Sequence, residues 1–276
     1  MKRWNKLCLI AGGGALPARL AAACQQQDWP IFIVRITGDA DPSLSAYDGA
    51  DCAIGEAGRV LREVKDAGCD AIVMAGNVQR PDFGAVKADW RGVALLPKVI
   101  AAAGKGDAAL ISVLVEMFEA EGLLVIGAEE VLQGLAAAAG VIAGRSPSKE
   151  ELSDIKKAAQ LITAIGPFDV GQGAVVAAGQ VLAIEAVEGT DAMLARCASV
   201  GPAARGVLVK RPKPGQELRV DLPTIGPTTI ENLQAANIAG VAVEAGQALV
   251  IDLDDVVRRA EAAGIFVYGF RAEDVQ

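Results

Sequence analysis

Apolar positions follow two different periods along the first half of the chain. Short apolar runs, typical of buried strands, alternate with longer stretches in which apolar residues return every three or four positions, as on one face of a helix. The runs that predict strands are 7–11, 30–36, 70–76 and 123–130, and the stretches that predict helices are 12–27, 59–68, 92–103 and 107–121. This alternation predicts an α/β fold with a parallel sheet that helices cover on both faces.

A segment rich in glycine, serine, proline and charge separates this half from the rest. We expect residues 1–135 to form a first domain, residues 136–150 a linker and residues 151–276 a second domain. Ser148 stands three residues before Glu151, and this spacing predicts a capping box at the start of a helix of roughly fifteen residues.

The second domain has a less regular pattern. The segment 173–194 predicts a β-hairpin that leads into a helix beginning near Thr190, and 206–210 predicts a strand. Helices are expected at 226–240 and 254–264, with short strands between them. This order predicts an α+β domain with mixed strand pairing.

Composition limits the chemistry that the chain can perform. It has 276 residues, a formal net charge of −8 and no histidine. The negative charge argues against a nucleic-acid partner, because such binders need cations to displace counterions from phosphates. The lack of histidine excludes a Ser-His-Asp triad, a Cys-His pair and a His-containing zinc site. Any metal is expected to be a hard ion held by oxygen atoms.

Cysteine spacing and the N-terminal segment indicate in which cellular compartment the protein is expected. Five scattered cysteines without a CxxC pair predict the reduced thiols of a cytoplasmic protein. The basic start and the alanines before Cys24 resemble an export signal, but three glycines, Pro17 and Arg19 interrupt the apolar run. Since the chain also lacks an uninterrupted apolar stretch of about 18 residues, we expect no membrane span.

Three glycines, Gly12, Gly13 and Gly14, stand between the first predicted strand and helix. At this corner of a doubly wound sheet, bare backbone N–H groups and a helix N-terminus favour a phosphate. A tight strand-to-helix turn would explain the glycines equally well. The dinucleotide fingerprint GxGxxG is not met, because its third glycine falls on Pro17, so a nucleotide-dependent oxidoreductase is the weaker interpretation.

Polar residues also follow the third predicted strand and precede the last helix of the first domain. Asn77 and Arg80 lie where such sheets bind ligands, although an ordinary solvated loop has the same composition. Lys105 precedes Asp107 at a helix start. Asp107 can serve as a helix cap, and Lys105 is placed to meet a phosphate.

In the second domain, Thr190 and Asp191 lie in an acidic turn together with Glu185 and Glu188. Either Thr190 or Asp191 can cap the following helix. The alternative is that this hydroxyl and these carboxylates meet a metal ion or a phosphate.

Four cations crowd into the segment 207–227 of this acidic chain, ahead of the carboxylate Asp221; they are Lys210, Arg211, Lys213 and Arg219. Lysine and arginine side chains there can neutralise a diphosphate, and Asp221 can hold a divalent cation that bridges the phosphates. A charge-balanced surface loop is the alternative. Three prolines stiffen the segment and would hold such groups in place.

Taken in order, several motifs resemble one family over residues 7–270. They are "LIAGGGALP", "MAGNVQRPDF", "KGDAAL", "DVGQGAVV", "AIEAVEGTDAML", "GVLVKRPKPGQELRVDLPTIGP" and "AGIFVYG". The family is that of the LpxI-type UDP-2,3-diacylglucosamine pyrophosphatases of lipid A biosynthesis. The resemblance implies a Rossmann-like N-terminal domain and an α+β C-terminal catalytic domain. It also implies a Mg²⁺-dependent hydrolase, with Mn²⁺ as a substitute, that releases UMP and 2,3-diacylglucosamine 1-phosphate.

The resemblance places the catalytic aspartate, in the pattern RxDxPxIG, on Asp221. We expect Asp221 and Asp191 to be the metal ligands. The expected substrate-binding residues are Gly12, Gly13, Gly14, Gly76, Asn77, Arg80, Lys105, Asp107, Thr190, Asp191, Lys210, Lys213, Gln216 and Arg219.

The implied partners are a lipid-linked nucleotide sugar and the inner face of the cytoplasmic membrane, on which the protein would lie peripherally. A homodimer is a further expectation. A non-catalytic lipid or nucleotide carrier is the alternative that composition and motifs leave open.

Overall fold

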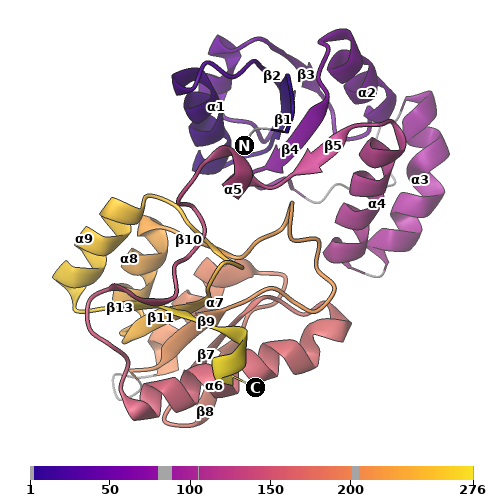
Figure 1. The fold of residues 1–276 in the computed structure, drawn as a ribbon. Coiled ribbons are helices and arrows are strands. Elements are labelled where there is room, and N and C mark those ends of the chain that lie inside the picture. The colour runs from indigo at the N-terminus through magenta and orange to yellow at the C-terminus, as the bar shows by residue number, and fades with distance from the viewer. Residues whose placement is uncertain (1–2, 80–88, 105, 201–204, 276) are drawn as a thin grey trace. The chain divides into compact units, whose positions relative to one another are not determined.

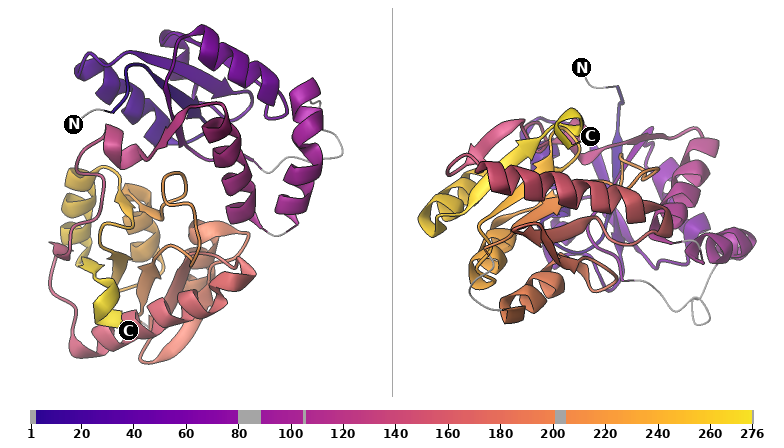
Figure 2. Two further views of the ribbon diagram at one scale, coloured as in Figure 1. Left: turned by 45° about the vertical axis from the view of Figure 1, so that its right-hand side comes forward. Right: turned by 90° about the horizontal axis from the view of Figure 1, so that it is seen from below.

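The computed structural model describes residues 3–79, 89–104, 106–200 and 205–275 (Figures 1 and 2). The chain divides into two compact units, Met1–Gln133 and Gly134–Gln276, and each is described by itself. The matching predictions of a parallel α/β sheet followed by an α+β half are confirmed.

The first unit is built on a five-stranded sheet of order β3-β2-β1-β4-β5, in which every pairing is parallel. Its strands are β1 (Leu7–Ala11), β2 (Ile31–Ile36), β3 (Gly49–Cys52), β4 (Ala71–Ala75) and β5 (Leu124–Ile126). Consecutive residues of β1 have no solvent exposure, which requires cover on both faces. Strand β3 was not predicted, because its four residues, "GADC", include no large or β-branched apolar side chain.

The helices of this unit are α1 (Ala15–Gln26), α2 (Ala57–Asp66), α3 (Trp90–Ala103), α4 (Asp107–Ala120) and the short α5 (Ala128–Val131). A 3₁₀ turn, η1 (Pro42–Ala46), joins β2 to β3. Helix α1 packs on β1 and β2, α2 on β2 and β3, and α4 on β5. Strand β5 is shorter than the strand predicted at 123–130, because the second half of that segment forms α5.

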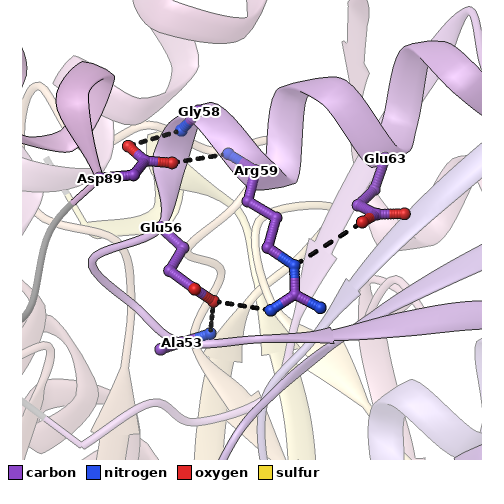
Figure 3. A network of polar contacts seen from close by, with 6 residues as sticks. All are labelled: Ala53, Glu56, Gly58, Arg59, Glu63 and Asp89. Atoms are coloured by element: carbon purple, nitrogen blue, oxygen red, sulfur yellow. Dashed lines mark hydrogen bonds and ion pairs between the residues drawn. The ribbon is translucent and has the colours of Figure 1, made fainter.

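The N-terminus of α2 is capped from a distant part of the chain (Figure 3). The Asp89 carboxylate accepts hydrogen bonds from the amides of Gly58 (3.2 Å) and Arg59 (2.7 Å). Glu56 accepts from the Ala53 amide at 2.9 Å and from the Arg59 guanidinium at 3.2 Å. A carboxylate at this end of a helix satisfies unpaired N–H groups and interacts favourably with the helix dipole.

Replacing Asp89 with alanine should therefore loosen the first turn of α2. We expect the Gly58 and Arg59 amides to exchange with solvent about fivefold faster, because a lost cap costs about 1 kcal/mol. Hydrogen exchange followed by NMR measures this directly. Asp66→Ala, at the opposite end of the same helix, is the control and should leave these amides unchanged; equal exchange in both variants would contradict the capping role.

The second unit is built on a six-stranded mixed sheet of order β6-β13-β11-β9-β7-β8. Its strands are β6 (Gly140–Ala143), β7 (Gly173–Ala177), β8 (Gln180–Ile184), β9 (Val207–Lys210), β11 (Gly240–Glu244) and β13 (Phe266–Phe270). Strands β9, β11 and β13 are parallel, while β6, β7 and β8 add antiparallel edges. A separate parallel pair joins β10 (Thr224–Ile225) to β12 (Leu249–Val250).

Helices cover both faces of this sheet. One core cluster joins α6 (Lys149–Ile165) to residues of β7, β9, β11 and β13. The other joins α7 (Gly189–Cys197), α8 (Pro227–Ala235) and α9 (Leu253–Ala263) to the opposite face. Along β7, Ala174 and Val176 face α6 while Val175 faces the other layer, as strand alternation requires. Short 3₁₀ turns, η2 (Gly166–Phe168), η3 (Ala198–Val200) and η4 (Ala272–Val275), complete the unit.

The stretch 136–150, expected as a linker, contains β6 and the start of α6. The capping box is present as predicted: the Ser148 hydroxyl accepts from the Glu151 amide, and the Glu151 carboxylate accepts from the Ser148 amide. Arg145 binds the same carboxylate with two nitrogens, at 2.6 and 2.7 Å. The Arg145 bond is the largest cause that lowers the pKa of Glu151, to about 2 from an ordinary value of 4.5.

This depressed pKa gives a pH-dependent contribution to stability. The contribution is complete above pH 4.5 and is lost as the pH falls toward 2, because the unfolded chain binds the proton first. Since Arg145 is half exposed, we expect Glu151→Gln to lower the free energy of unfolding at pH 7 by only about 1–2 kcal/mol. Urea unfolding should show a clearly larger loss at pH 7 than at pH 3, because protonation of Glu151 in the folded protein begins to remove the contribution as the pH approaches 2, and Glu150→Gln is the control. A similar loss at both pH values would contradict the charge effect.

Candidate functional site

The loop between β9 and β10, residues 211–223, carries the predicted catalytic carboxylate. The side chain of Gln216 forms hydrogen bonds that hold this loop in place. Gln216 is 7% exposed, and its Nε2 donates to the backbone carbonyl of Asp221 and, at 3.1 Å, to the Gln172 side chain. Its Oε1 accepts from the Lys213 amide at 2.8 Å. Gln216 therefore ties both ends of the loop to the segment before β7, and it fixes the backbone at Asp221.

Three of the four cations in this region have carboxylate partners. Arg211 pairs with Glu244 at 2.9 Å, and Arg219 pairs with Glu217 at 2.7 Å. Lys213 pairs with Asp169, which follows α6 and η2. The charge of the loop is thus largely balanced within the second unit, which favours an ordered loop over a bare cationic patch.

The fourth cation, Lys210, is the last residue of β9 and is 5% exposed. Its Nζ donates to the Thr190 hydroxyl at 2.8 Å and to the Thr224 carbonyl at 3.2 Å. Burial lowers the pKa of the Lys210 ammonium, and the nearby carboxylates of Glu185, Asp191 and Asp221 oppose this shift. The structure therefore brings Thr190, Asp191, Lys210 and Asp221 together, although they come from α7, β9 and the loop.

Asp191 and Asp221 differ in their surroundings. Asp191 is exposed in the first turn of α7 and accepts a hydrogen bond from Asn232 of α8 at 2.8 Å. Asp221 is half-buried, and its amide donates to the Glu217 carbonyl at 3.0 Å. Neither Thr190 nor Asp191 caps α7, whose N-cap position is Glu188, so the capping alternative is wrong.

A metal site built from protein groups alone is not evident: within residues 3–79, 89–104, 106–200 and 205–275, no three acidic or thiol side chains are placed to hold one ion. The charges nevertheless suit a divalent cation. Lys210 is one positive charge among the three carboxylates of Glu185, Asp191 and Asp221. Mg²⁺ commonly takes one or two carboxylates and completes its shell with water and substrate phosphates, and Asp191 and Asp221 fit that requirement.

In the first unit, the glycine run meets the loop after β4. The amides of Gly12 and Gly13 donate to the carbonyls of Ala75 (2.9 Å) and Asn77 (2.7 Å), and the Asn77 amide donates back to Gly13 at 3.0 Å. Gly76 has φ +91°, and a Cβ there would lie 2.5 Å from the Gly13 carbonyl. These contacts use the two amides and favour the tight-turn interpretation, while a substrate role for the four glycines and Asn77 stays a prediction.

The remaining expected residues of the first unit are less informative. Gly14 is the N-cap residue of α1, and no side chain caps this end of the helix. Asp107 is the first residue of α4, whose N-cap is Gly106, so Asp107 is not itself the cap. Arg80 and Lys105 lie outside the described residues.

One buried residue in the second unit was noted only as part of the acidic turn. Glu185 follows β8, is 7% exposed and accepts a hydrogen bond from the Thr190 hydroxyl at 2.8 Å. The signal that could have found it is a glutamate directly after the apolar strand "VLAI".

The comparisons with known proteins agree with this arrangement. Residues 6–135 match the LpxI N-terminal domain, and residues 138–268 match the LpxI C-terminal domain. A relative from Caulobacter vibrioides, the UDP-2,3-diacylglucosamine pyrophosphatase LpxI, is 48% identical over an alignment of 272 residues that covers 96% of this chain and 97% of the relative. Because both domains match in order and nearly the whole chain is covered, the protein belongs to the LpxI family.

Proposed function

We propose that this protein hydrolyses the pyrophosphate bond of UDP-2,3-diacylglucosamine and releases UMP and 2,3-diacylglucosamine 1-phosphate, a step of lipid A biosynthesis. The observation that carries the proposal is the similarity to the Caulobacter vibrioides enzyme along the full length of both chains. The ordered loop around Asp221 supports it, because a hydrolase needs a carboxylate held in a defined place.

In this proposal Asp221 is the catalytic residue. Its carboxylate orients the attacking water or holds a divalent cation, and the Gln216 side chain fixes the backbone that carries it. Asp191 is the second candidate ligand. Lys213 and Arg219 lie in the loop, and their ammonium and guanidinium groups are candidate donors to phosphate oxygens.

Mg²⁺ is the proposed cofactor, with Mn²⁺ as a substitute. A divalent cation bound to Asp191 and Asp221 would screen the charge of the diphosphate and lower the pKa of a bound water. The group formed by Lys210, Glu185, Asp191 and Asp221 carries more negative than positive charge, so an anionic substrate would be repelled unless a cation came with it.

We propose a peripheral location on the inner face of the cytoplasmic membrane, because the acyl chains of the substrate are anchored there. Among the described helices, none has the length and apolarity to cross a bilayer. Phe168 and Val187 are 80% and 100% exposed and offer apolar contacts on the second unit. A homodimer stays a prediction, and no nucleic-acid partner is expected.

The direct test is to incubate the purified protein with UDP-2,3-diacylglucosamine and Mg²⁺ and to measure UMP by chromatography. Release of UMP together with 2,3-diacylglucosamine 1-phosphate is the expected result. Recovery of bound but unchanged substrate would instead favour a carrier.

A further inference from the structure

A chain of hydrogen bonds connects three elements beneath the loop of Asp221. The Lys210 ammonium, at the end of β9, donates to the Thr190 hydroxyl of α7. The Thr190 hydroxyl donates in turn to Oε1 of Glu185, which follows β8. The direction of the chain is fixed, since an ammonium can only donate and a hydroxyl that accepts from it has one proton left to give. Glu185 thus ends the chain as an acceptor.

The burial of Glu185 is unusual for a carboxylate. The residue is 7% exposed, and its second oxygen, Oε2, is buried without a hydrogen-bond partner. Such an oxygen costs stability, so packing alone does not explain its presence. Two glycines at and before the start of β7 make room for this residue: a Cβ at Gly173 would lie 2.6 Å from this oxygen, and one at Gly171 would lie 2.2 Å from the backbone carbonyl of Glu185.

The charge of the buried Lys210 explains why a carboxylate is present at Glu185. Lys210 is almost fully buried, and a buried ammonium stays protonated only beside anions. Three carboxylates lie near enough to oppose the effect of burial on its pKa: Glu185 after β8, Asp191 in α7 and Asp221 in the loop. Asp191 and Asp221 are the two proposed for the cation and the reaction. Glu185 is then the anion that remains for Lys210 when the other two are engaged.

We propose that Glu185 is a positioning residue: through Thr190 it holds a charged Lys210 beside Asp191 and Asp221, so that Lys210 serves as an internal cation of the site rather than as a diphosphate ligand reached from solvent. The inference rests on the proposed hydrolase function. It assigns Glu185 an effect on the rate and on its pH dependence, without contact with the substrate.

The variant that isolates the charge is Glu185→Gln, because glutamine has the same shape and can still accept from Thr190. We expect kcat for UMP release to fall by about tenfold or more, with KM unchanged within about threefold. The alkaline limb of the kcat profile should move to lower pH by about one unit, because losing an anion makes Lys210 give up its proton more easily. Glu188→Gln is the matched control, since Glu188 lies in the same turn but is exposed and paired with Arg196.

A second readout does not depend on catalysis. NMR of protein labelled at lysine gives the titration of Lys210 directly, with the signal identified by its absence in Lys210→Arg. Its pKa should be lower in Glu185→Gln than in Glu188→Gln. Thr190→Val, which removes the connecting hydroxyl, should move the rate and the titration in the same direction and keeps the proposal testable if Glu185→Gln does not fold.

The outcomes separate the two proposals. If the wild-type protein releases no UMP, the hydrolase function fails, and the lysine titration still tests the coupling. If the wild-type protein is active and Glu185→Gln matches Glu188→Gln in kcat, alkaline limb and lysine titration, the positioning role of Glu185 is overturned.

Discussion

Asp221→Ala should slow UMP release by about a thousandfold or more while the protein still binds UDP-2,3-diacylglucosamine. A carboxylate that holds a cation or orients water stabilises the transition state more than the bound substrate, so its loss appears mainly in kcat. Binding should be kept or even strengthened, because an anion is removed from beside an anionic ligand. Steady-state kinetics together with equilibrium binding of the uncleaved substrate measure both effects.

The control for Asp221 is Asp252→Asn. Asp252 is the N-cap of α9, with φ 57°, and its side chain accepts no capping hydrogen bond; asparagine tolerates this backbone conformation. The variant should stay within about tenfold of the wild-type rate. Near-normal turnover by Asp221→Ala would refute the catalytic assignment. Loss of binding together with activity would instead identify Asp221 as a residue needed for binding or folding.

Removal of divalent cations should abolish activity, with at least about a hundredfold loss in excess EDTA and recovery when Mg²⁺ or Mn²⁺ is added. The reason is electrostatic. An anionic diphosphate must approach the carboxylates of Glu185, Asp191 and Asp221 around Lys210, and a divalent ion bound to Asp191 and Asp221 would offset their negative charge. Assays of UMP release across a series of metal concentrations test the expectation.

Metal binding can also be followed without turnover, by titrating Mn²⁺ into the protein and recording its electron paramagnetic resonance signal. Asp191→Asn and Asp221→Asn should each weaken binding, whereas Glu188→Gln should not. Full activity in excess EDTA would remove the metal from the mechanism. Unchanged Mn²⁺ affinity in both aspartate variants would place the ion elsewhere.

Most helices and strands follow from the sequence because their periodicity reflects burial that the fold then provides. The capping box at Ser148 is local and was predicted for the same reason. Strand β3 was missed because its four residues become a strand only by pairing with β2, from Ile33 opposite Gly49 to Ile36 opposite Cys52. Such pairing is a tertiary effect that four residues without a large apolar side chain do not reveal.

The candidate site likewise has features that the sequence shows and features that depend on tertiary contacts. The cluster of cations near Asp221 is visible in the sequence. Their carboxylate partners are not, since Lys213 pairs with Asp169, which is 44 residues away in the sequence. Burial of Lys210 likewise depends on how β9, α7 and the loop pack. The sequence indicates which residues carry charge, and only the fold determines which charges neutralise one another.

The pairing of the glycine turn with the loop after β4 has a consequence for protein engineering. Replacing Pro17 with glycine would complete the written dinucleotide fingerprint, with Gly12, Gly14 and position 17 in register. It would not create a pyrophosphate cradle, because the Gly12 and Gly13 amides would still be bound to Ala75 and Asn77. A designer who wanted a redox cofactor in this scaffold would first have to separate the glycine turn from residues 75–77 and give that segment a new backbone path.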